Sequence, residues 1–184
     1  MLEIAQRLLD RLDAGVPLVV ATAIAVEGSM PRTLGTSMSW DGTAAIGSIA
    51  GGCIEGAIVE VAERVLDDSC TRIIEFGVSD ADALSVGLAC GGVVRLHLAV
   101  VRPGDQIVQM LRDAVAGSPA SVALTASGYS IAAGGDAVYV DAIEPPARMI
   151  IVGAMEFSVA LSAAAQVLGY AVTVCDPREL FATP

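Results

Sequence analysis

Apolar runs no longer than a β-strand are the feature that most limits how this chain can fold. Hydrophobic residues make up 54% of its 184 residues, and the mean hydropathy is +0.68. A helix that crosses a membrane needs about 18 or more consecutive apolar residues, and no run of that length occurs. The runs are those of strands buried in a sheet that helices cover. The sequence therefore predicts an α/β protein without a membrane span.

Residues 1–143 are predicted to form one α+β domain. An amphipathic helix over residues 2–13 precedes a valine-rich strand, residues 17–26, which has no polar face and should be buried on both sides. Asp41-Gly42 is typical of a two-residue hairpin turn. The other expected elements are strands over 36–40 and 43–48, a helix over 54–67, strands over 71–76 and 92–101, a helix over 103–116, and a meander of strands over 121–125, 129–133 and 137–143.

The residues after position 143 have a different pattern. Pro145 and Pro146 make residues 144–147 an extended linker. Residues 148–184 then give a strand, a helix over 156–168 and a second strand that ends before Asp176, which is a β-α-β unit like the first part of a Rossmann domain. The residues expected on the inner side of this helix are Val159, Ala160, Ala163, Val167 and Leu168.

The dinucleotide-binding pattern in this unit is incomplete. Only Gly153 stands where the G-x-G-x-x-G fingerprint needs glycine, because Met155 and Ser158 hold the second and third positions. Asp176 stands where a ribose-binding acid belongs. Without the second glycine the backbone cannot approach a pyrophosphate closely, so NAD(P) binding is not expected. A small NAD(P)-binding oxidoreductase, or an oxidoreductase subunit, is kept as the alternative function.

Charge and side-chain counts exclude several other classes of protein. A net charge of −11 and the absence of lysine oppose a nucleic-acid surface. The N-terminus lacks the features of a secretion signal, so a cytoplasmic location is expected. The four cysteines form no C-x-x-C pair and His97 is the only histidine, so neither structural zinc nor a Ser-His-Asp triad is expected. His97 is interpreted as a solvated or hydrogen-bonded residue on the outer face of its strand, beside Arg95.

Two glycine-rich segments each carry a cysteine beside a Gly-Gly pair. The first is Gly47-Ser-Ile-Ala-Gly-Gly-Cys-Ile-Glu-Gly56, which runs into a helix, and the second is Gly87-Leu-Ala-Cys-Gly-Gly92. Glycine lets consecutive N–H groups point into one concavity that suits an anion, and the start of a helix adds to this effect. We therefore expect free N–H groups around Cys53. The alternative is that both segments are tight turns with small buried cysteines.

These motifs resemble those of the XdhC/CoxI family. The resemblance also covers Pro31-Arg-Thr-Leu-Gly-Thr-Ser-Met38 and Gly169-Tyr-Ala-Val-Thr-Val-Cys-Asp-Pro-Arg178, and so spans nearly the whole chain. It implies an N-terminal XdhC domain followed by a Rossmann-like segment. It also implies an accessory protein, a chaperone rather than an enzyme, that binds the molybdenum cofactor (molybdopterin) transiently. Such a protein supports sulfuration of the cofactor and its insertion into xanthine dehydrogenase or a related molybdenum hydroxylase.

The resemblance also implies partners and site residues. The expected partners are a molybdenum hydroxylase of the xanthine or carbon monoxide dehydrogenase type and a cysteine desulfurase. Whether Cys53 or Cys90 contacts the cofactor stays open, and no catalytic residue or protein-bound metal is expected. A parallel sheet of only two strands should need a second copy to complete it, so a homodimer is expected; a longer parent protein is left open. The expected cofactor-binding residues are Cys53, Cys90, Gly51, Gly52, Glu55, Gly91, Gly92 and Arg32.

Overall fold

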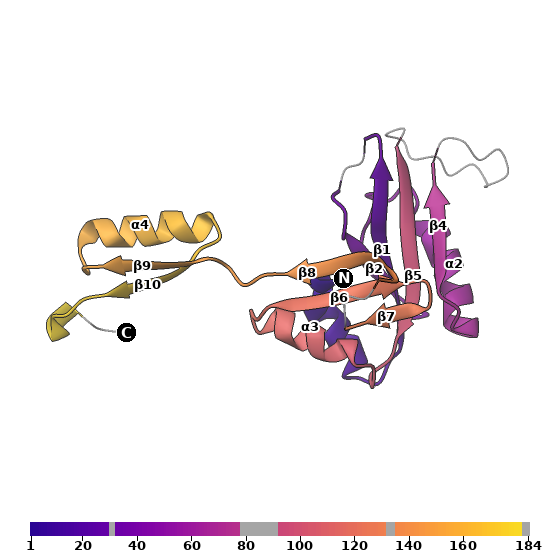
Figure 1. Cartoon of the computed structure of the whole chain (residues 1–184), viewed down its shortest axis with the longest axis horizontal. Coiled ribbons are helices and arrows are strands. Elements are labelled where there is room, and N and C mark those ends of the chain that lie inside the picture. The colour runs from indigo at the N-terminus through magenta and orange to yellow at the C-terminus, as the bar shows by residue number, and fades with distance from the viewer. Residues whose placement is uncertain (30–31, 78–91, 132–134, 182–184) are drawn as a thin grey trace. The chain divides into compact units, whose positions relative to one another are not determined.

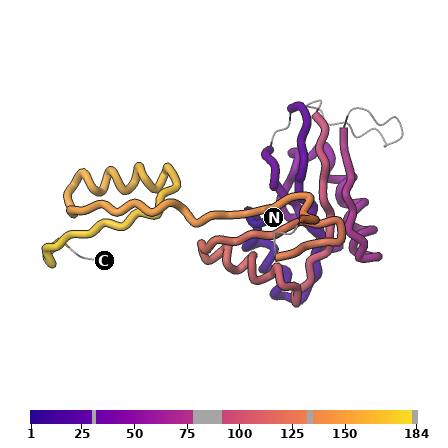
Figure 2. The backbone as a smooth tube through the Cα atoms, in the orientation of Figure 1, coloured from indigo at the N-terminus to yellow at the C-terminus, as the bar shows by residue number. Residues whose placement is uncertain are grey.

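A computed structural model describes residues 1–29, 32–77, 92–131 and 135–181. The chain divides into two compact units, Met1–Ile143 and Glu144–Pro184 (Figures 1 and 2). The first unit contains η1 (Leu2–Ile4), α1 (Ala5–Leu12), β1 (Leu18–Glu27), β2 (Ser37–Trp40), β3 (Ala45–Gly47), α2 (Glu55–Asp68), β4 (Arg72–Phe76), β5 (Val93–Val101), α3 (Ile107–Val115), β6 (Ala120–Thr125), β7 (Gly128–Ser130) and β8 (Ala137–Ile143). The second contains β9 (Arg148–Val152), α4 (Glu156–Val167), β10 (Ala171–Cys175) and η2 (Glu179–Phe181). These mixed helices and sheets confirm the predicted α/β class.

A five-stranded antiparallel sheet with the order β3-β2-β1-β5-β4 is the centre of the first unit. Its middle strand, β1, is buried on both faces from Leu18 to Ala23, as predicted. Side chains alternate between the faces of a strand. Leu18 and Val20 therefore belong to one core cluster, while Val19 and Ala21 belong to another.

Helix α2 covers one face of this sheet. Its buried residues Ile58, Ala62 and Val65 recur at helical spacing. They pack in one cluster with strand residues that include Val19 and Leu96. The predicted helix over 54–67 is confirmed, and it ends at Ser69, whose left-handed backbone (φ 59°) stops the α-helical turn.

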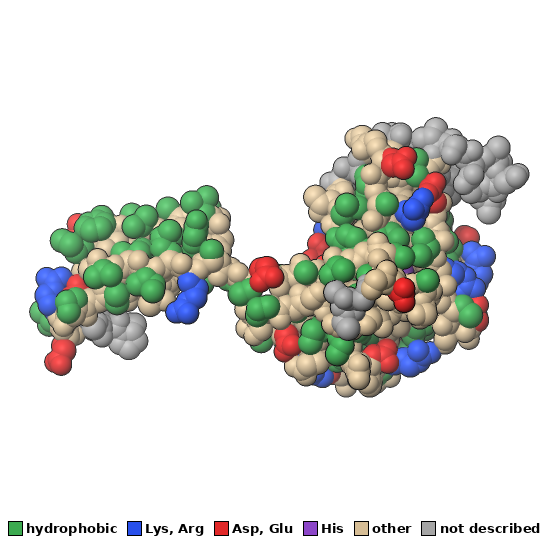
Figure 3. Space-filling view, viewed as in Figure 1, with side chains coloured by type: hydrophobic (Ala, Val, Ile, Leu, Met, Phe, Trp, Pro, Cys, Tyr) green, Lys and Arg blue, Asp and Glu red, His purple; other side chains and the backbone are tan. Residues whose placement is uncertain are grey.

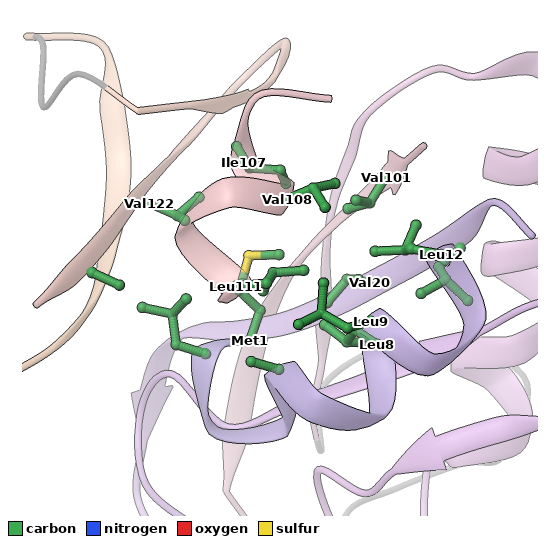
Figure 4. Packing of buried hydrophobic residues seen from close by; sticks show 14 of the residues in the cluster. Met1, Leu8, Leu9, Leu12, Val20, Val101, Ile107, Val108, Leu111 and Val122 are labelled. Carbon is green, nitrogen blue, oxygen red and sulfur yellow. The ribbon is translucent and has the colours of Figure 1, made fainter. Parts of the chain in front are cut away.

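The opposite face of the sheet packs against α1, α3 and a smaller three-stranded sheet. The cluster between these elements is shown in Figure 4, where α1 and α3 lie together over β1 and β5. The N-terminal ammonium of Met1 is buried at its edge and pairs with the carboxylate of Asp141 on β8. The labelled members of the cluster are Met1, Leu8, Leu9, Leu12, Val20, Val101, Ile107, Val108, Leu111 and Val122.

The three-stranded sheet has the order β7-β6-β8, so the predicted meander is wrong. In a meander the middle strand in sequence, β7, would also be the middle strand in space. Here β6 is in the middle, and its residues Val122, Ala123 and Leu124 are buried while β7 and β8 are not. The most buried strand holds the central position, where both its edges are paired.

Two predicted boundaries are also corrected. Trp40 pairs with Ala45, so the hairpin loop spans Asp41 to Ala44 and is longer than two residues. Asp41 causes this, because its Oδ1 atom accepts hydrogen bonds from both Thr43 and Ala44. The predicted helix over 103–116 begins only at Ile107, because the chain first makes a turn from residue 102 to residue 105.

His97 lies on the face of β5 predicted from the alternation, opposite Leu96 and Leu98, but it is completely buried. The second layer covers this face: the imidazole lies edge-on to Tyr129, 5.3 Å between ring centroids. Its Nε2 atom is 2.9 Å from the carbonyl oxygen of Thr125. A carbonyl only accepts, so Nε2 carries the proton. The histidine is hydrogen-bonded as predicted, but it is not solvated.

The second unit is the predicted β-α-β unit, with β9 and β10 paired in parallel. The predicted inner side of α4 is wrong. Small residues, Ser158 and Ala165, are buried against the sheet, whereas Val159 and Val167 are 72% and 88% exposed. Small side chains allow a helix to approach a sheet closely, which leaves the larger apolar residues on the outer surface visible in Figure 3. No helix in the described parts of the chain has the length and apolarity needed to cross a membrane.

Candidate functional site

The loops predicted to form the site follow three strands of the five-stranded sheet, β1, β3 and β4, of which β1 and β4 are labelled in Figure 1. Glu27, the last residue of β1, pairs with Val93, the first residue of β5. Phe76, the last residue of β4, pairs with Val94. Strand β3 runs in the same direction as β1, because both are antiparallel to β2. The segments that follow β1, β3 and β4 therefore all leave the sheet in the same direction.

Gly92, the last residue of the second Gly-Cys motif, is buried against the segment that follows β1. A Cβ atom at this position would lie 3.1 Å from the carbonyl oxygen of Glu27 and even closer to that of Ser29. Glycine is therefore required here by a close approach of two backbones. Cys90 and Gly91 lie outside the described residues, so the expectation that Cys53 and Cys90 share one pocket stays a prediction.

Residues beside both motifs contribute to one core. Ile54 follows Cys53 and is completely buried, and Val94 lies two residues after Gly92 and is completely buried as well. Both belong to the cluster under α2, together with Ile49 and Ala50 of the first motif. The first motif and the strand that follows the second are thus fixed to the same hydrophobic layer.

The carboxylate of Glu55 occupies the inside of the first Gly-Cys loop. Glu55 is the first residue of α2, and its side chain turns back toward the preceding loop. Its Oε1 atom accepts hydrogen bonds from Ser48 Oγ at 2.6 Å, Ile49 N at 3.1 Å and Ala50 N at 2.9 Å. Its Oε2 atom accepts from Gly52 N at 2.8 Å and Ile54 N at 3.2 Å.

These bonds correct the expectation that the loop offers free N–H groups to a ligand. The amides of Ile49, Ala50, Gly52 and Ile54 are all bound to Glu55. Although burial alone would raise the pKa of the Glu55 carboxyl, the hydrogen bonds outweigh it and lower the pKa from 4.5 to about 2. The glycines do allow a concave group of backbone N–H, but the anion that it binds is the protein's own carboxylate.

Ser48 is a structural residue of the loop that the sequence interpretation missed. Its hydroxyl donates to Glu55 and accepts the amide of Gly51 at 3.1 Å. Serine often bonds to nearby backbone in turns, and its place at the start of a Gly-Gly segment was the available signal. With this bond, the hydrogen bonds of the loop include every residue from Ser48 to Gly52.

Cys53 is exposed at the tip of this loop. The residues on both sides of it, Gly52 and Ile54, donate their amides to the same oxygen of Glu55. Gly51 and Gly52 have φ values of +72° and +110°, which only glycine adopts easily, and there is open space where their Cβ atoms would be. The thiol is thus presented outward by a backbone that is fixed on the inside.

Arg32 is exposed and is linked through Glu3 to the start of β2. Its guanidinium is 3.5 Å from the carboxylate of Glu3, which also accepts the amide of Ser37 at 2.9 Å. Ser37 begins β2, and Gly47, at the end of β3, packs against the Ser37 carbonyl. Glu3 was not predicted, because a pair 29 residues apart in sequence leaves no local pattern.

The remaining candidates for reactive groups are His97 and clusters of possible metal ligands. His97 is buried, and burial lowers the pKa of its imidazole, so it is neutral near pH 7. No cluster of three or more histidine, cysteine, aspartate or glutamate side chains suited to a metal ion is found within these residues.

The carboxylate of Asp176, at the ribose-binding position of a Rossmann unit, is already hydrogen-bonded within the protein. Its carboxylate accepts the amide of Ala154 at 2.9 Å and two side-chain bonds from Arg178 at 2.9 and 2.8 Å. These bonds to Arg178 lower the pKa of the Asp176 carboxyl. The side chain is 1% exposed. A ribose hydroxyl would have to displace these donors, so the geometry does not favour the alternative of NAD(P) binding.

Comparison with known proteins shows which protein family this chain resembles. The model of the XdhC and CoxI family matches residues 11–77, which include β1, the hairpin, the first Gly-Cys loop, α2 and β4. The resemblance to the XdhC and CoxI family that the sequence predicts is thereby confirmed over these residues.

Two particular relatives follow. The chain is 25% identical over 202 residues to a protein of Bacillus subtilis (strain 168) described as a probable subunit of xanthine dehydrogenase, a match that covers 90% of this chain and 61% of that protein. Its fold is similar to the crystal structure of a protein described as a xanthine dehydrogenase from Bacillus halodurans, with a TM-score of 0.62 and 23% identity over 97% of this chain and 64% of the other. The chain spans less than two thirds of the length of each relative.

Proposed function

We propose that the protein is an accessory protein of a xanthine dehydrogenase or a related molybdenum hydroxylase, and that it binds the molybdenum cofactor and supports its sulfuration and insertion. The observation that carries this proposal is the exposed thiol of Cys53 on a loop whose backbone is held by Glu55. A thiolate is a soft ligand that suits molybdenum or a transferable sulfur atom. The match to the XdhC and CoxI family model and the description of the Bacillus subtilis relative support the same role.

The donor groups of the site fit the cofactor in part. When bound, molybdopterin would supply a metal with an exchangeable terminal ligand, and a phosphate. Cys53 is the residue of the described chain that would face the metal or its sulfur. The phosphate does not fit the loop amides, because Glu55 already binds them. Arg32, which is 45% exposed beside Glu3, would hold the phosphate through its guanidinium.

The partners in this proposal are the molybdenum hydroxylase that receives the cofactor, a cysteine desulfurase that provides sulfur, and a second copy of the chain. Support for the second copy comes from the exposed apolar residues of the β-α-β unit (Figure 3). A two-stranded parallel sheet with such residues on its surface is normally covered.

Cofactor retention by cysteine variants tests the proposal. The protein and its Cys53→Ala variant are purified from molybdate-fed cells, and pterin fluorescence is measured after release from the protein. We expect Cys53→Ala to lose pterin. Cys70→Ala is the matched control, because Cys70 is also an exposed thiol of the same unit. Equal pterin content in Cys53→Ala and Cys70→Ala would contradict a role of Cys53.

A further inference from the structure

The loop between β3 and α2 has an unusual internal partner. A single carboxylate, that of Glu55, accepts four backbone amides and one hydroxyl from the residues that precede it. The two amides bound by its Oε2 atom flank Cys53, while the side chain of Cys53 itself stays exposed. Glu55 therefore fixes the backbone on both sides of the thiol. Both of its carboxylate oxygens are hydrogen-bonded to the loop.

We propose that Glu55 is a positioning residue: its carboxylate is a built-in anion that fills the loop and fixes Cys53 in its outward orientation. The proposal rests on the function proposed above insofar as Cys53 serves the cofactor. It changes the role expected for Glu55, from a group that contacts the cofactor to one that acts through Cys53. It also places the cofactor's phosphate outside the loop amides.

Both the charge and the reach of Glu55 matter in this role. Glutamine has the same shape but only one accepting oxygen, and its NH2 group would face the amides of Gly52 and Ile54, which are donors themselves. Alanine would leave the amides directed at an empty space of carboxylate size. An anion such as formate or phosphate fits that space, because concave groups of backbone N–H bind anions.

Chemical rescue of Glu55→Ala tests the proposal. The amide resonances of Ile49, Ala50, Gly52 and Ile54 are followed by 15N NMR while sodium formate, and separately inorganic phosphate, is added. We expect shifts in Glu55→Ala and none in the wild-type protein, whose loop is filled. Asp41→Ala is the matched control, because Asp41 also holds a loop of the first unit through backbone amides, those of Thr43 and Ala44; these four resonances should not respond to formate there.

Pterin retention provides the second readout. Glu55→Ala should lose pterin, and formate should restore it, whereas the loss caused by Cys53→Ala should not be restored. Rescue by a free anion separates positioning from a general loss of structure. If Glu55→Ala does not fold, Glu55→Gln replaces it, and the expected result is faster hydrogen exchange at Gly52 and Ile54 with loss of pterin.

Each other outcome has a distinct meaning. If the four amide resonances do not shift with formate in a folded Glu55→Ala variant, the proposal is wrong. A Glu55→Ala variant that keeps or gains pterin and loses it when phosphate is added would also overturn it, because the loop would then be the phosphate site. If the wild-type protein retains no pterin while the formate shifts occur in Glu55→Ala, the proposed function fails and the anion role of Glu55 stands.

Discussion

A Cβ atom on Gly92 would collide with the carbonyl oxygen of Ser29. The Gly92→Ala variant therefore forces apart two backbone segments, the one that follows β1 and the one that precedes β5. Overpacking of this kind costs about 1–3 kcal/mol, and urea unfolding should show a loss of that size. Gly56→Ala is the control, since a Cβ there meets nothing within 4 Å. At this position in α2 alanine should stabilise by about 0.5–1 kcal/mol. Equal effects of the two substitutions would contradict the close approach at Gly92.

The low pKa of Glu55 predicts a specific pH dependence of stability. The carboxyl has a pKa of about 2 when folded and 4.5 as the reference value. Between these values the unfolded chain binds more protons, so the stabilisation is complete above pH 4.5 and is lost as the pH falls toward 2. The difference in unfolding free energy between the wild-type protein and Glu55→Gln should shrink in this window. Glu60→Gln on the exposed side of the same helix controls for a general charge effect. A difference that does not change with pH would show that the carboxylate is not ionised in the loop.

The burial of His97 predicts a second pH dependence, at higher pH. Burial lowers the pKa of its imidazole below 6.5 in the folded protein, so the unfolded chain takes up a proton more readily. Stability should then fall as the pH decreases through 6.5, and His97→Phe should lack this component. His97→Phe should also cost about 1–3 kcal/mol at pH 8, because the Thr125 carbonyl loses its donor. Pterin retention by a folded His97→Phe protein should be unchanged; its loss would make His97 part of the site.

The two Gly-Cys motifs are predicted to bring Cys53 and Cys90 into one pocket. Cys70 and Cys175 are exposed, so both are first replaced by serine to remove competing thiols. Mild oxidation of this variant should then form an intramolecular disulfide between Cys53 and Cys90, which peptide mass spectrometry detects. A disulfide needs Cα atoms within about 7 Å. If only intermolecular disulfides or free thiols are recovered, the prediction that Cys53 and Cys90 share a pocket is wrong.

Association through the second unit is predicted from its exposed apolar residues. Light scattering at micromolar concentration should give the mass of a dimer. Val167→Glu should shift the protein toward the monomer, because Val167 is 88% exposed on α4 and a charge opposes burial at an interface. Val115→Glu is the control in the first unit, where Val115 is also exposed. A wild-type monomer would rule out the homodimer.

Local patterns predicted the elements whose residues repeat regularly. The apolar run around Val19 and Val20 identified β1, and the helical spacing of Ile58, Ala62 and Val65 identified α2. The glycines beside Cys53 indicated a concave group of backbone N–H, although these groups bind Glu55 and not a ligand. In each case the physical cause acts within a few residues of sequence.

Pairings between distant residues could not be predicted in the same way. The position of β8 next to β6 depends on which edge of β6 is free after folding. The burial of His97 depends on Tyr129, which comes from the second layer. Glu55 fills the Gly-Cys loop because its side chain turns back from α2. A glutamate in the first turn of a helix is equally favourable when it faces solvent, so the sequence does not show which way it turns. Arg32 and Glu3 meet only because η1 packs beside β2.

The alternation of side chains along β1 has a consequence for how the first unit unfolds. Val20 belongs to the core with α1 and α3, and its neighbour Val19 belongs to the core with α2. Removing β1 from either core also removes it from the other, so the two cores should melt together as a single cooperative foldon. The amides of β1 should then exchange with solvent deuterium only through global opening of this unit. The β-α-β unit has a separate core around Ile151, Ser158 and Ala165, and its amides should exchange earlier through an opening of their own.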